Sequence, residues 1–282
     1  MKLSWRCEEC IYERQKQLTD DEGYLKEVKA IIDNRREHDA SAYLSYLINQ
    51  VYERRFGVRK RSYKAENRQY NDLVLSMEDK LRKQIEESED PLALAMVYGR
   101  VGNYIDFGTL NSVNEEEFLS LFDKAEYADR DKKDFESFKR QCAEAKTFLL
   151  IADNNGEIVI DKLFIEQLRK LYPHLDISVM VRGAEAANDV TEEDAAYVGI
   201  DKCARIISNG AEIAGTVYDM CSDEAKKALD ETDVILAKGQ GNYESLAKMG
   251  RHIFYSFLCK CELFTERFSV PLFTGIFVEE TE

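Results

Sequence analysis

The segment from Thr147 to Pro173 constrains the fold of this chain more than any other part of the sequence. An apolar run, Phe148–Ala152, ends abruptly in the polar residues 153–157 (DNNGE), and a helical pattern follows. A buried strand, a tight polar turn and a helix form the opening unit of a parallel α/β sheet. Ligand sites in open sheets of this kind lie at the carboxyl ends of the strands. The sequence therefore predicts a binding crevice beside Asp153 and Asn154.

Apolar runs and helical patterns continue to alternate after Pro173. The further apolar runs are Ile177–Val181, Ala204–Ser208, Val234–Ala237 and Ile253–Phe257. Helical patterns begin near Glu157, Thr191, Ser222 and Asn242. Because strands separated by helices form parallel sheets with right-handed crossovers, we predict an α/β fold with a Rossmann-like, mostly parallel sheet.

Residues 1–145 have a different pattern, which is typical of helices joined by short turns. In one of these helices, Asp90 is expected to be the N-cap and Pro91 to lie in the first turn. We therefore predict two parts. An α-helical N-terminal region, residues 1–145, packs on a Rossmann-like α/β core, residues 146–282, which carries the ligand site.

The composition narrows the class of protein. Hydrophobic residues make up 44% of the 282 residues and charged residues 33%, as in soluble globular proteins. The formal net charge of −15 argues against a nucleic-acid partner. No segment is apolar enough to span a membrane, and the first residues lack a signal-peptide core. Seven irregularly spaced cysteines favour reduced thiols, so we expect a cytoplasmic protein.

Oxygen-bearing side chains follow two of the predicted strands. Asp153 and Asn154 follow the first strand, and Asp189 lies after the second, just before the helix that Thr191 begins. Asp189 on its own is explained by a role in starting that helix. If it instead meets Asp153 and Asn154, two carboxylates and an amide oxygen form a site for a hard divalent cation. Such ligands accept Mn²⁺, Co²⁺, Ni²⁺ or Mg²⁺ with differing affinity.

The segment KGQGN, residues 238–242, directly follows another predicted strand. Its glycines allow the backbone to approach an anion closely, and Lys238 would add positive charge. A plain strand-to-helix turn is the alternative, because the segment has neither the dinucleotide nor the Walker spacing. Gly239, Gln240, Gly241 and Asn242 are therefore candidate phosphate contacts, and a nucleotide cofactor is disfavoured.

Four more polar residues are candidates for the same crevice. Lys260 follows the last predicted strand, where it is either a solvated lysine or a charge that neutralises a phosphoryl group. Asn103 and Asp106 end a helix of the N-terminal region, where they either cap that helix or face the crevice. Glu157 is a first-turn helix acid or a base beside the metal.

The cysteine and histidine residues give weaker signals. Cys7 and Cys10 form a CxxC pair, but a zinc site needs about two further ligands, so the role of this pair stays open. The histidines, His38, His174 and His252, are scattered, which gives little support to catalysis by histidine.

Taken in order, these motifs resemble the damage-control phosphatase family, long catalogued only as a domain of unknown function. The matching pieces spread from residue 7 to residue 261: the CxxC pair, GNYIDFG, ADNNGE, RGAEAANDVTEEDA, KGQGNYESL and the lysine of FLCKC. The CxxC pair and the KGQGN form look like the microbial subgroup of stand-alone proteins. Two departures are Asn155, where many relatives have alanine, and the AEAAND loop, which lacks a proline that relatives often carry.

The resemblance implies a helical region on a Rossmann-like core and a divalent-metal-dependent phosphatase. It assigns metal binding to Asp153, Asn154 and Asp189, and phosphate contacts to residues 239–242 and Lys260. We expect hydrolysis of phosphate monoesters of small metabolites, such as sugar phosphates, with Asp153 and Lys260 as catalytic residues. A carboxyl methyltransferase that uses S-adenosylmethionine and a non-catalytic metal- or phosphate-binding module are the alternatives. The sequence leaves the oligomeric state open.

Overall fold

The computed structural model describes residues 4–36, 39–58, 61–103, 120–123, 125, 127–247 and 250–280. Six strands form one sheet: β1 Thr147–Ile151, β2 Asp176–Val181, β3 Arg205–Ser208, β4 Val234–Lys238, β5 Ile253–Leu258 and β6 Gly275–Glu280. The described helices of the N-terminal region are α1 Trp5–Leu18, α2 Glu22–Asp33, α3 Ser41–Phe56, α4 Lys64–Glu86, α5 Pro91–Gly102 and α7 Asp129–Glu144. Those of the core are α8 Glu157–Leu171, α9 Glu192–Val198, α10 Asp223–Glu231, α11 Gln240–Leu246 and α12 Glu262–Phe268, with short 3₁₀ turns at Ile200–Lys202 and Tyr218–Met220.

The strand order is β3-β2-β1-β4-β5-β6, and all neighbouring strands are parallel except β5 and β6. The prediction of a Rossmann-like, mostly parallel sheet is therefore confirmed. The order reverses between β1 and β4, and open α/β sheets have their ligand crevice outside the carboxyl ends of the strands at such a point. The loops that follow β1 and β4 carry the ADNNGE and KGQGN segments.

All five predicted strands lie within two residues of their expected bounds, but β6 was not predicted from the sequence. Only Ile276 and Phe277 of β6 are buried, and three of its last residues are half-buried on the sheet edge. A short edge strand of this kind lacks both the continuous apolar run of a central strand and a clear alternation.

Local capping explains where several helices begin. The Asp90 carboxylate accepts a hydrogen bond from the Ala93 N–H, with Pro91 in the first turn, as predicted. Thr191 and Asp194 form the expected reciprocal capping box at the start of α9. The helix predicted to begin near Asn242 begins at Gln240, two residues earlier, so residues 240–242 belong to the first turn of α11.

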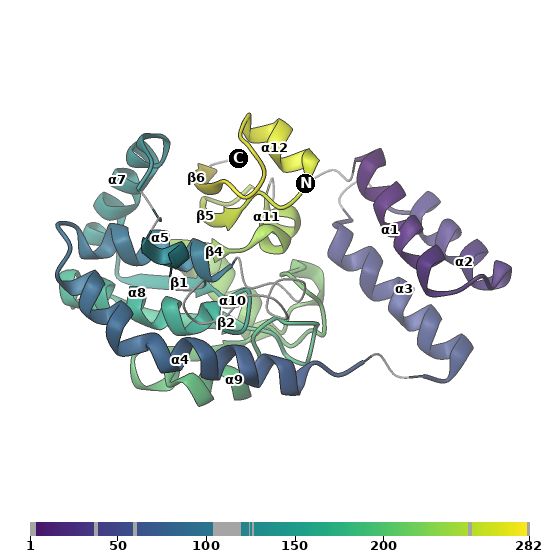
Figure 1. The fold of residues 1–282 in the computed structure, drawn as a ribbon, viewed down its shortest axis with the longest axis horizontal. Helices are drawn as coiled ribbons and strands as arrows, with labels where there is room; N and C mark the ends of the chain where they lie inside the picture. The colour runs from purple at the N-terminus through teal and green to yellow at the C-terminus, as the bar shows by residue number, and fades with distance from the viewer. Residues whose placement is uncertain are drawn as a thin grey trace.

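Hydrophobic packing divides the molecule differently from the predicted boundary at residue 145. Helices α4, α5, α7 and α8 share one core with one face of the sheet, while α10, α11 and α12 pack on the other face. Helices α1, α2 and α3 have a small core of their own and lie to one side of this three-layer body (Figure 1). Among the described helices, none has the length and apolar character that crossing a bilayer requires.

Candidate functional site

Asp153 lies two residues beyond β1, and hydrogen bonds from two neighbouring amides hold its carboxylate. Asn103 Nδ2 donates to Asp153 Oδ2 at 2.9 Å and to Glu157 Oε2 at 2.7 Å. Asn154 Nδ2 donates to the same Asp153 oxygen at 2.7 Å. The end of α5 thus meets the start of α8 at the carboxyl edge of the sheet. Asp106, the other candidate from this segment, lies outside the described residues.

The loops after β1 and β2 are joined along their backbones, which brings Asp189 beside Asn154. Asn154 and Asp189 form an isolated antiparallel bridge, and the Val190 N–H donates to the Asp153 carbonyl at 2.9 Å. Asn155 strengthens this junction, because its Nδ2 donates to the Asn188 and Asp189 carbonyls at 3.0 and 3.2 Å. The three predicted metal ligands therefore come from two adjoining loops.

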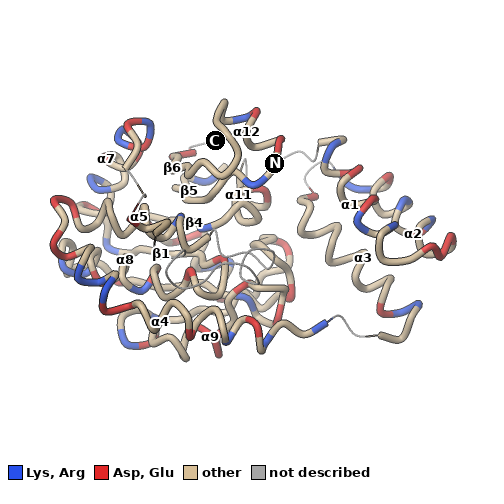
Figure 2. The backbone as a smooth tube through the Cα atoms, in the orientation of Figure 1, with Lys and Arg blue, Asp and Glu red and all other residues tan. Residues whose placement is uncertain are grey.

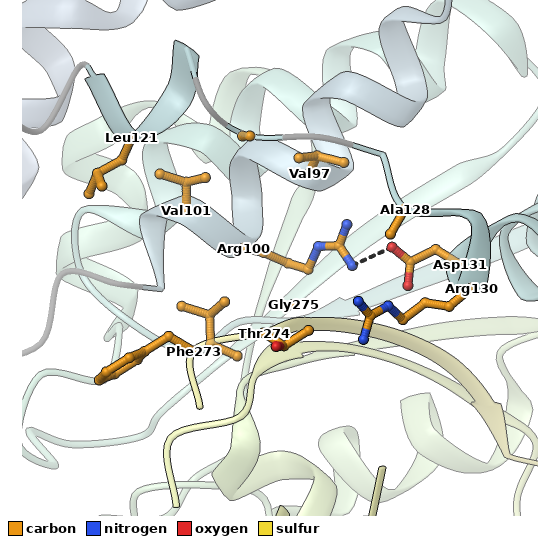
Figure 3. A pocket seen from close by; sticks show the side chains of 12 residues that line it. Val97, Arg100, Val101, Leu121, Ala128, Arg130, Asp131, Phe273, Thr274 and Gly275 are labelled. Atoms are coloured by element: carbon orange, nitrogen blue, oxygen red, sulfur yellow. Dashed lines mark hydrogen bonds and ion pairs between the residues drawn. The ribbon is translucent and has the colours of Figure 1, made fainter. Parts of the chain in front are cut away.

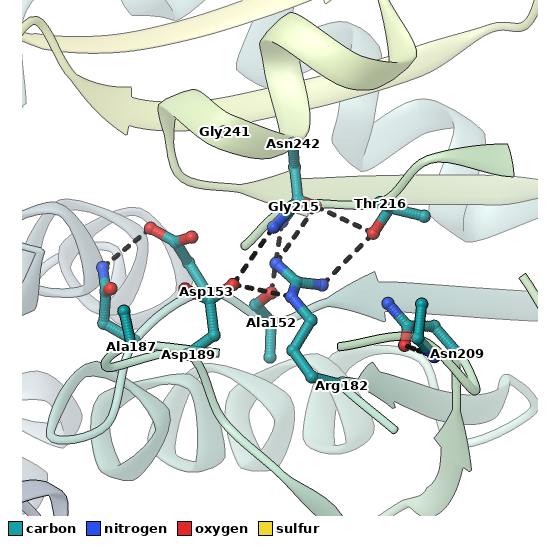
Figure 4. A network of polar contacts seen from close by, with 12 residues as sticks. Ala152, Asp153, Arg182, Ala187, Asp189, Asn209, Gly215, Thr216, Gly241 and Asn242 are labelled. Atoms are coloured by element: carbon teal, nitrogen blue, oxygen red, sulfur yellow. Dashed lines mark hydrogen bonds and ion pairs between the residues drawn. The ribbon is translucent and has the colours of Figure 1, made fainter. Parts of the chain in front are cut away.

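Arg182 directly follows β2 and was not among the predicted site residues, yet its guanidinium organises the floor of the site (Figure 4). It is only 1% exposed, and its Nε donates to Asp189 Oδ2 at 2.6 Å. The Gly215 N–H donates to the same Asp189 oxygen at 3.2 Å. Terminal nitrogens of Arg182 donate to Thr216 Oγ1 and Asn242 Oδ1 at 3.2 and 3.3 Å. A buried arginine thus neutralises and orients Asp189.

The glycine after β4 is required by its contact with Asp153. Gly239 has φ +78°, and a Cβ at this position would lie 1.9 Å from Asp153 Oδ2. The Gly239 N–H donates to the Ser256 carbonyl, so it is not directed at a ligand. Asn242 is fully buried, and its Nδ2 donates to the Ala152 and Lys238 carbonyls at 3.1 and 2.7 Å. Asn242 therefore ties β1 to β4 and does not reach a substrate directly.

Lys238 was expected to contact a phosphate, but in the structure it contacts two carboxylates. Its side chain is buried, and its Nζ lies 2.5 Å from Glu157 Oε1 and 2.7 Å from Asp161 Oδ1. Burial lowers the pKa of Lys238, but the two carboxylates outweigh it and raise that pKa above its ordinary value. Lys238 acts on the site through Glu157, whose other oxygen accepts the bond from Asn103. Sequence reasoning missed this because Asp161 lies 77 residues away along the chain.

Gln240 and Lys260 come from the turns that follow β4 and β5. The Lys260 N–H donates to Gln240 Oε1 at 2.8 Å, which couples the turns after β4 and β5. Burial, together with the negative charges of Asp189 and Glu157, raises the pKa of Asp153 to about 7, against the opposing charges of Lys260 and Arg182. The effects that raise the pKa of Asp153 thus outweigh the positive charges of Lys260 and Arg182, which lower it.

The side-chain oxygens of Asp153, Asn154 and Asp189 suit a divalent cation. The amide oxygen of Asn154 is needed as well as the two carboxylates. Among the described residues, no three His, Cys, Asp or Glu side chains converge closely enough to hold an ion by themselves. Asn154 Oδ1 accepts from Asn188 Nδ2 at 2.6 Å, while its Nδ2 faces Asp153. Because the two ends of an amide are nearly equal in shape, a half-turn presents the oxygen instead.

The CxxC pair lies away from Asp153, on α1. Cys7 is half-buried and its Sγ accepts a hydrogen bond from Ser4 Oγ, while Cys10 is exposed. Burial raises the pKa of the Cys7 thiol, and Cys261 is among the neighbours that raise it further. All seven cysteines are free thiols.

The fold and this site define an open α/β protein with a cluster of acidic and amide side chains at the switch point of its sheet. The family model for the damage-control phosphatase ARMT1-like domain matches residues 4–274. A damage-control phosphatase of Archaeoglobus fulgidus is 30% identical over 274 residues, 93% of each chain. The chain belongs to the damage-control phosphatase family, which confirms the resemblance seen in the motifs; its place in the CxxC subgroup stays a prediction.

Pyrococcus horikoshii provides a second relative and a solved structure. Its damage-control phosphatase PH1575 is 34% identical over 181 residues, 63% of this chain and 61% of that protein. The crystal structure of PH1575, described as a duf89 family protein, matches all of both chains with a TM-score of 0.81 and 23% identity, which supports the fold. The names of these relatives support phosphatase activity for the family.

Proposed function

We propose that this chain is a divalent-metal-dependent phosphatase that hydrolyses phosphate monoesters of small metabolites. The observation that carries the proposal is the position of Asp153 at the switch point of the sheet, between Asp189 and Glu157. The charges of Asp189 and Glu157 raise the pKa of Asp153, which favours a cation beside it, and the family membership gives the reaction class.

Asp153, Asn154 and Asp189 would hold the metal, which when bound supplies Lewis-acid stabilisation of a phosphoryl oxygen. The other residues act on the reacting groups or on these ligands. Arg182 fixes the Asp189 carboxylate, and Asn103 fixes those of Asp153 and Glu157. Lys260 lies close enough to Asp153 to lower its pKa, and its ammonium would neutralise charge on the transferred group.

The test is phosphate release from p-nitrophenyl phosphate and sugar phosphates by chelator-treated protein, with Mn²⁺, Co²⁺, Ni²⁺ or Mg²⁺ added back. Asp153→Ala and Asp189→Ala should each abolish metal-restored activity and weaken metal binding measured by calorimetry. Asp201→Asn is the matched control, because Asp201 is an exposed carboxylate of the same chain. Full activity in Asp153→Ala, or activity unaffected by chelation, would refute the proposal.

A further inference from the structure

A cavity lies at the same edge of the sheet as the candidate active site. It has a volume of about 300 Å³ and lies between the end of α5, the start of α7 and the β5–β6 pair (Figure 3). Leu258 pairs with Gly275 where β5 ends and β6 begins, so both mark the carboxyl edge of the parallel strands. Lys260 follows Leu258 by two residues, and Asn103 follows the lining residue Arg100 by three.

The walls of this cavity are apolar, and the charged side chains among its described lining residues sum to one positive charge. Val97, Val101 and Leu121 line one side. Arg100 NH1 lies 2.7 Å from Asp131 Oδ2, and both side chains are buried, so this pair is electrically neutral. Arg130 is exposed at the mouth and adds one positive charge in a protein whose formal net charge is −15.

The Arg130 charge faces the strand end that leads to Lys260. Burial raises the pKa of Cys259 to about 11, and Arg130 is the charge that opposes this rise. Cys259 is the residue between Leu258, which lines the cavity, and Lys260. The guanidinium of Arg130 therefore lies near the end of β5, the strand that Lys260 follows.

Phe273 forms a further wall, and its backbone is held in an unusual conformation. Its φ is +60°, in the left-handed region that aromatic residues rarely adopt, and its side chain is 49% exposed. Two hydrogen bonds fix this turn: the Phe273 N–H donates to the Cys259 carbonyl at 2.8 Å, and the Cys259 N–H to the Thr274 carbonyl at 2.9 Å. Strained backbone that the surroundings hold in place is concentrated at ligand sites.

We propose that this cavity binds the part of the substrate that leaves after phosphoryl transfer, and that this part carries a second anionic group, a carboxylate or a phosphate, paired with Arg130. The inference rests on the proposed phosphatase function. The cavity volume of about 300 Å³ is at the small end of the range for small-molecule sites, about 300–1,000 Å³. Its ligand is therefore the size of a short sugar or hydroxy acid, and the apolar walls cover the carbon chain.

The experiment compares kcat/KM for matched phosphate esters that differ in the second anion. The pairs are glycerol 3-phosphate against 3-phosphoglycerate, for a carboxylate, and fructose 1-phosphate against fructose 1,6-bisphosphate, for a phosphate. We expect the wild type to favour the doubly anionic member of at least one pair about tenfold or more, as charge-assisted hydrogen bonds allow. The pair that shows the preference identifies the anion.

Arg130→Gln should remove that preference by raising KM for the doubly anionic ester, with p-nitrophenyl phosphate and the singly charged esters changed less than about twofold. Lys133→Gln, an exposed change on the same helix, is the control and should keep the preference. Equal kcat/KM within both pairs, or an equal loss on every ester in Arg130→Gln, would overturn the inference.

A failure of the phosphatase proposal is distinguishable from a failure of this one. If no ester is hydrolysed with any metal, calorimetry with the same two pairs of compounds still tests the cavity. Tighter binding of the doubly anionic member to the wild type, lost in Arg130→Gln, would support it. Equal binding in both proteins would overturn it.

Discussion

Replacing Lys238 with methionine tests the buried charges beneath the site. The Lys238 ammonium is the shared partner of Glu157 and Asp161, at 2.5 and 2.7 Å, and all three side chains are buried. Methionine fills most of the space of the lysine stem but leaves the two carboxylates unpaired. Removing one partner from a buried ion pair costs about 3–5 kcal/mol. Urea unfolding at pH 7 should show a loss of this size in the free energy of unfolding.

The loss should depend on pH in a defined direction. Burial raises the pKa of Asp161 from 3.8 to about 7, with Lys238 opposing the rise and Glu157 adding to it. A carboxyl whose pKa is raised by folding binds more protons in the native state, so its contribution to stability falls as the pH rises from about 4 to 7. Without Lys238 the pKa rises further and the window extends above pH 7. The destabilisation should therefore shrink on acidification, by up to about 1.4 kcal/mol per pH unit for each proton bound.

Lys162→Met is the matched control for this variant. Lys162 lies on α8 next to Asp161 and is buried, but its Nζ pairs with Glu78 at 2.8 Å and with the Val198 carbonyl, away from Asp153. Both variants should lose stability, whereas only Lys238→Met should also lose metal-dependent activity at a temperature where both are folded. A loss below about 1 kcal/mol, a loss independent of pH from 6 to 8, or equal inactivation of both variants would refute the reasoning.

Two further substitutions test the packing of the site loops. Gly239→Ala should abolish activity, because its Cβ would collide with the Asp153 carboxylate. Gly57→Ala is the control, since Gly57 has a similar φ of +65° but open space around it. This control should lose only about 1–2 kcal/mol of stability in thermal unfolding and keep full activity. Asn155→Ala should lower the free energy of unfolding by about 1–3 kcal/mol and weaken metal binding, because Asn71 and two loop carbonyls lose their hydrogen-bond partner. Unchanged stability would contradict the role of Asn155 in joining the two loops.

The sheet and its crevice could be predicted because the signals are local. Each central strand is a short apolar run, and helix starts such as Asp90 and Thr191 carry their caps within three residues. Parallel topology then placed Asp153 and Asp189 at one edge without any knowledge of contacts. The sequence left open whether Asn103 joins these residues, since this depends on how α5 packs against the start of α8, about 50 residues further along the chain.

The basic partners of these acids could not be predicted from the sequence, for a physical reason. Arg182 and Lys238 each follow or end an apolar strand, where a cationic residue ordinarily marks solvent. Both are instead buried, because each neutralises a carboxylate from another element: Arg182 pairs with Asp189, and Lys238 with Glu157 and Asp161. A buried charge is tolerated only with such a partner, and the partner is defined by the fold.

These pairs also bear on the proposed metal site. Arg182 neutralises Asp189, and Lys238 neutralises Glu157 and Asp161, so the flanking acids already have partners. The pKa of Asp153 is nevertheless raised to about 7 by burial and by the charges of Asp189 and Glu157, and the charges of Lys260 and Arg182 only partly oppose this rise. A divalent ion at Asp153 would stabilise its ionised carboxylate and add the positive charge that favours binding of a phosphate. In the proposed phosphatase, the buried cations would thus hold the flanking acids in place and leave the Asp153 carboxylate for the metal.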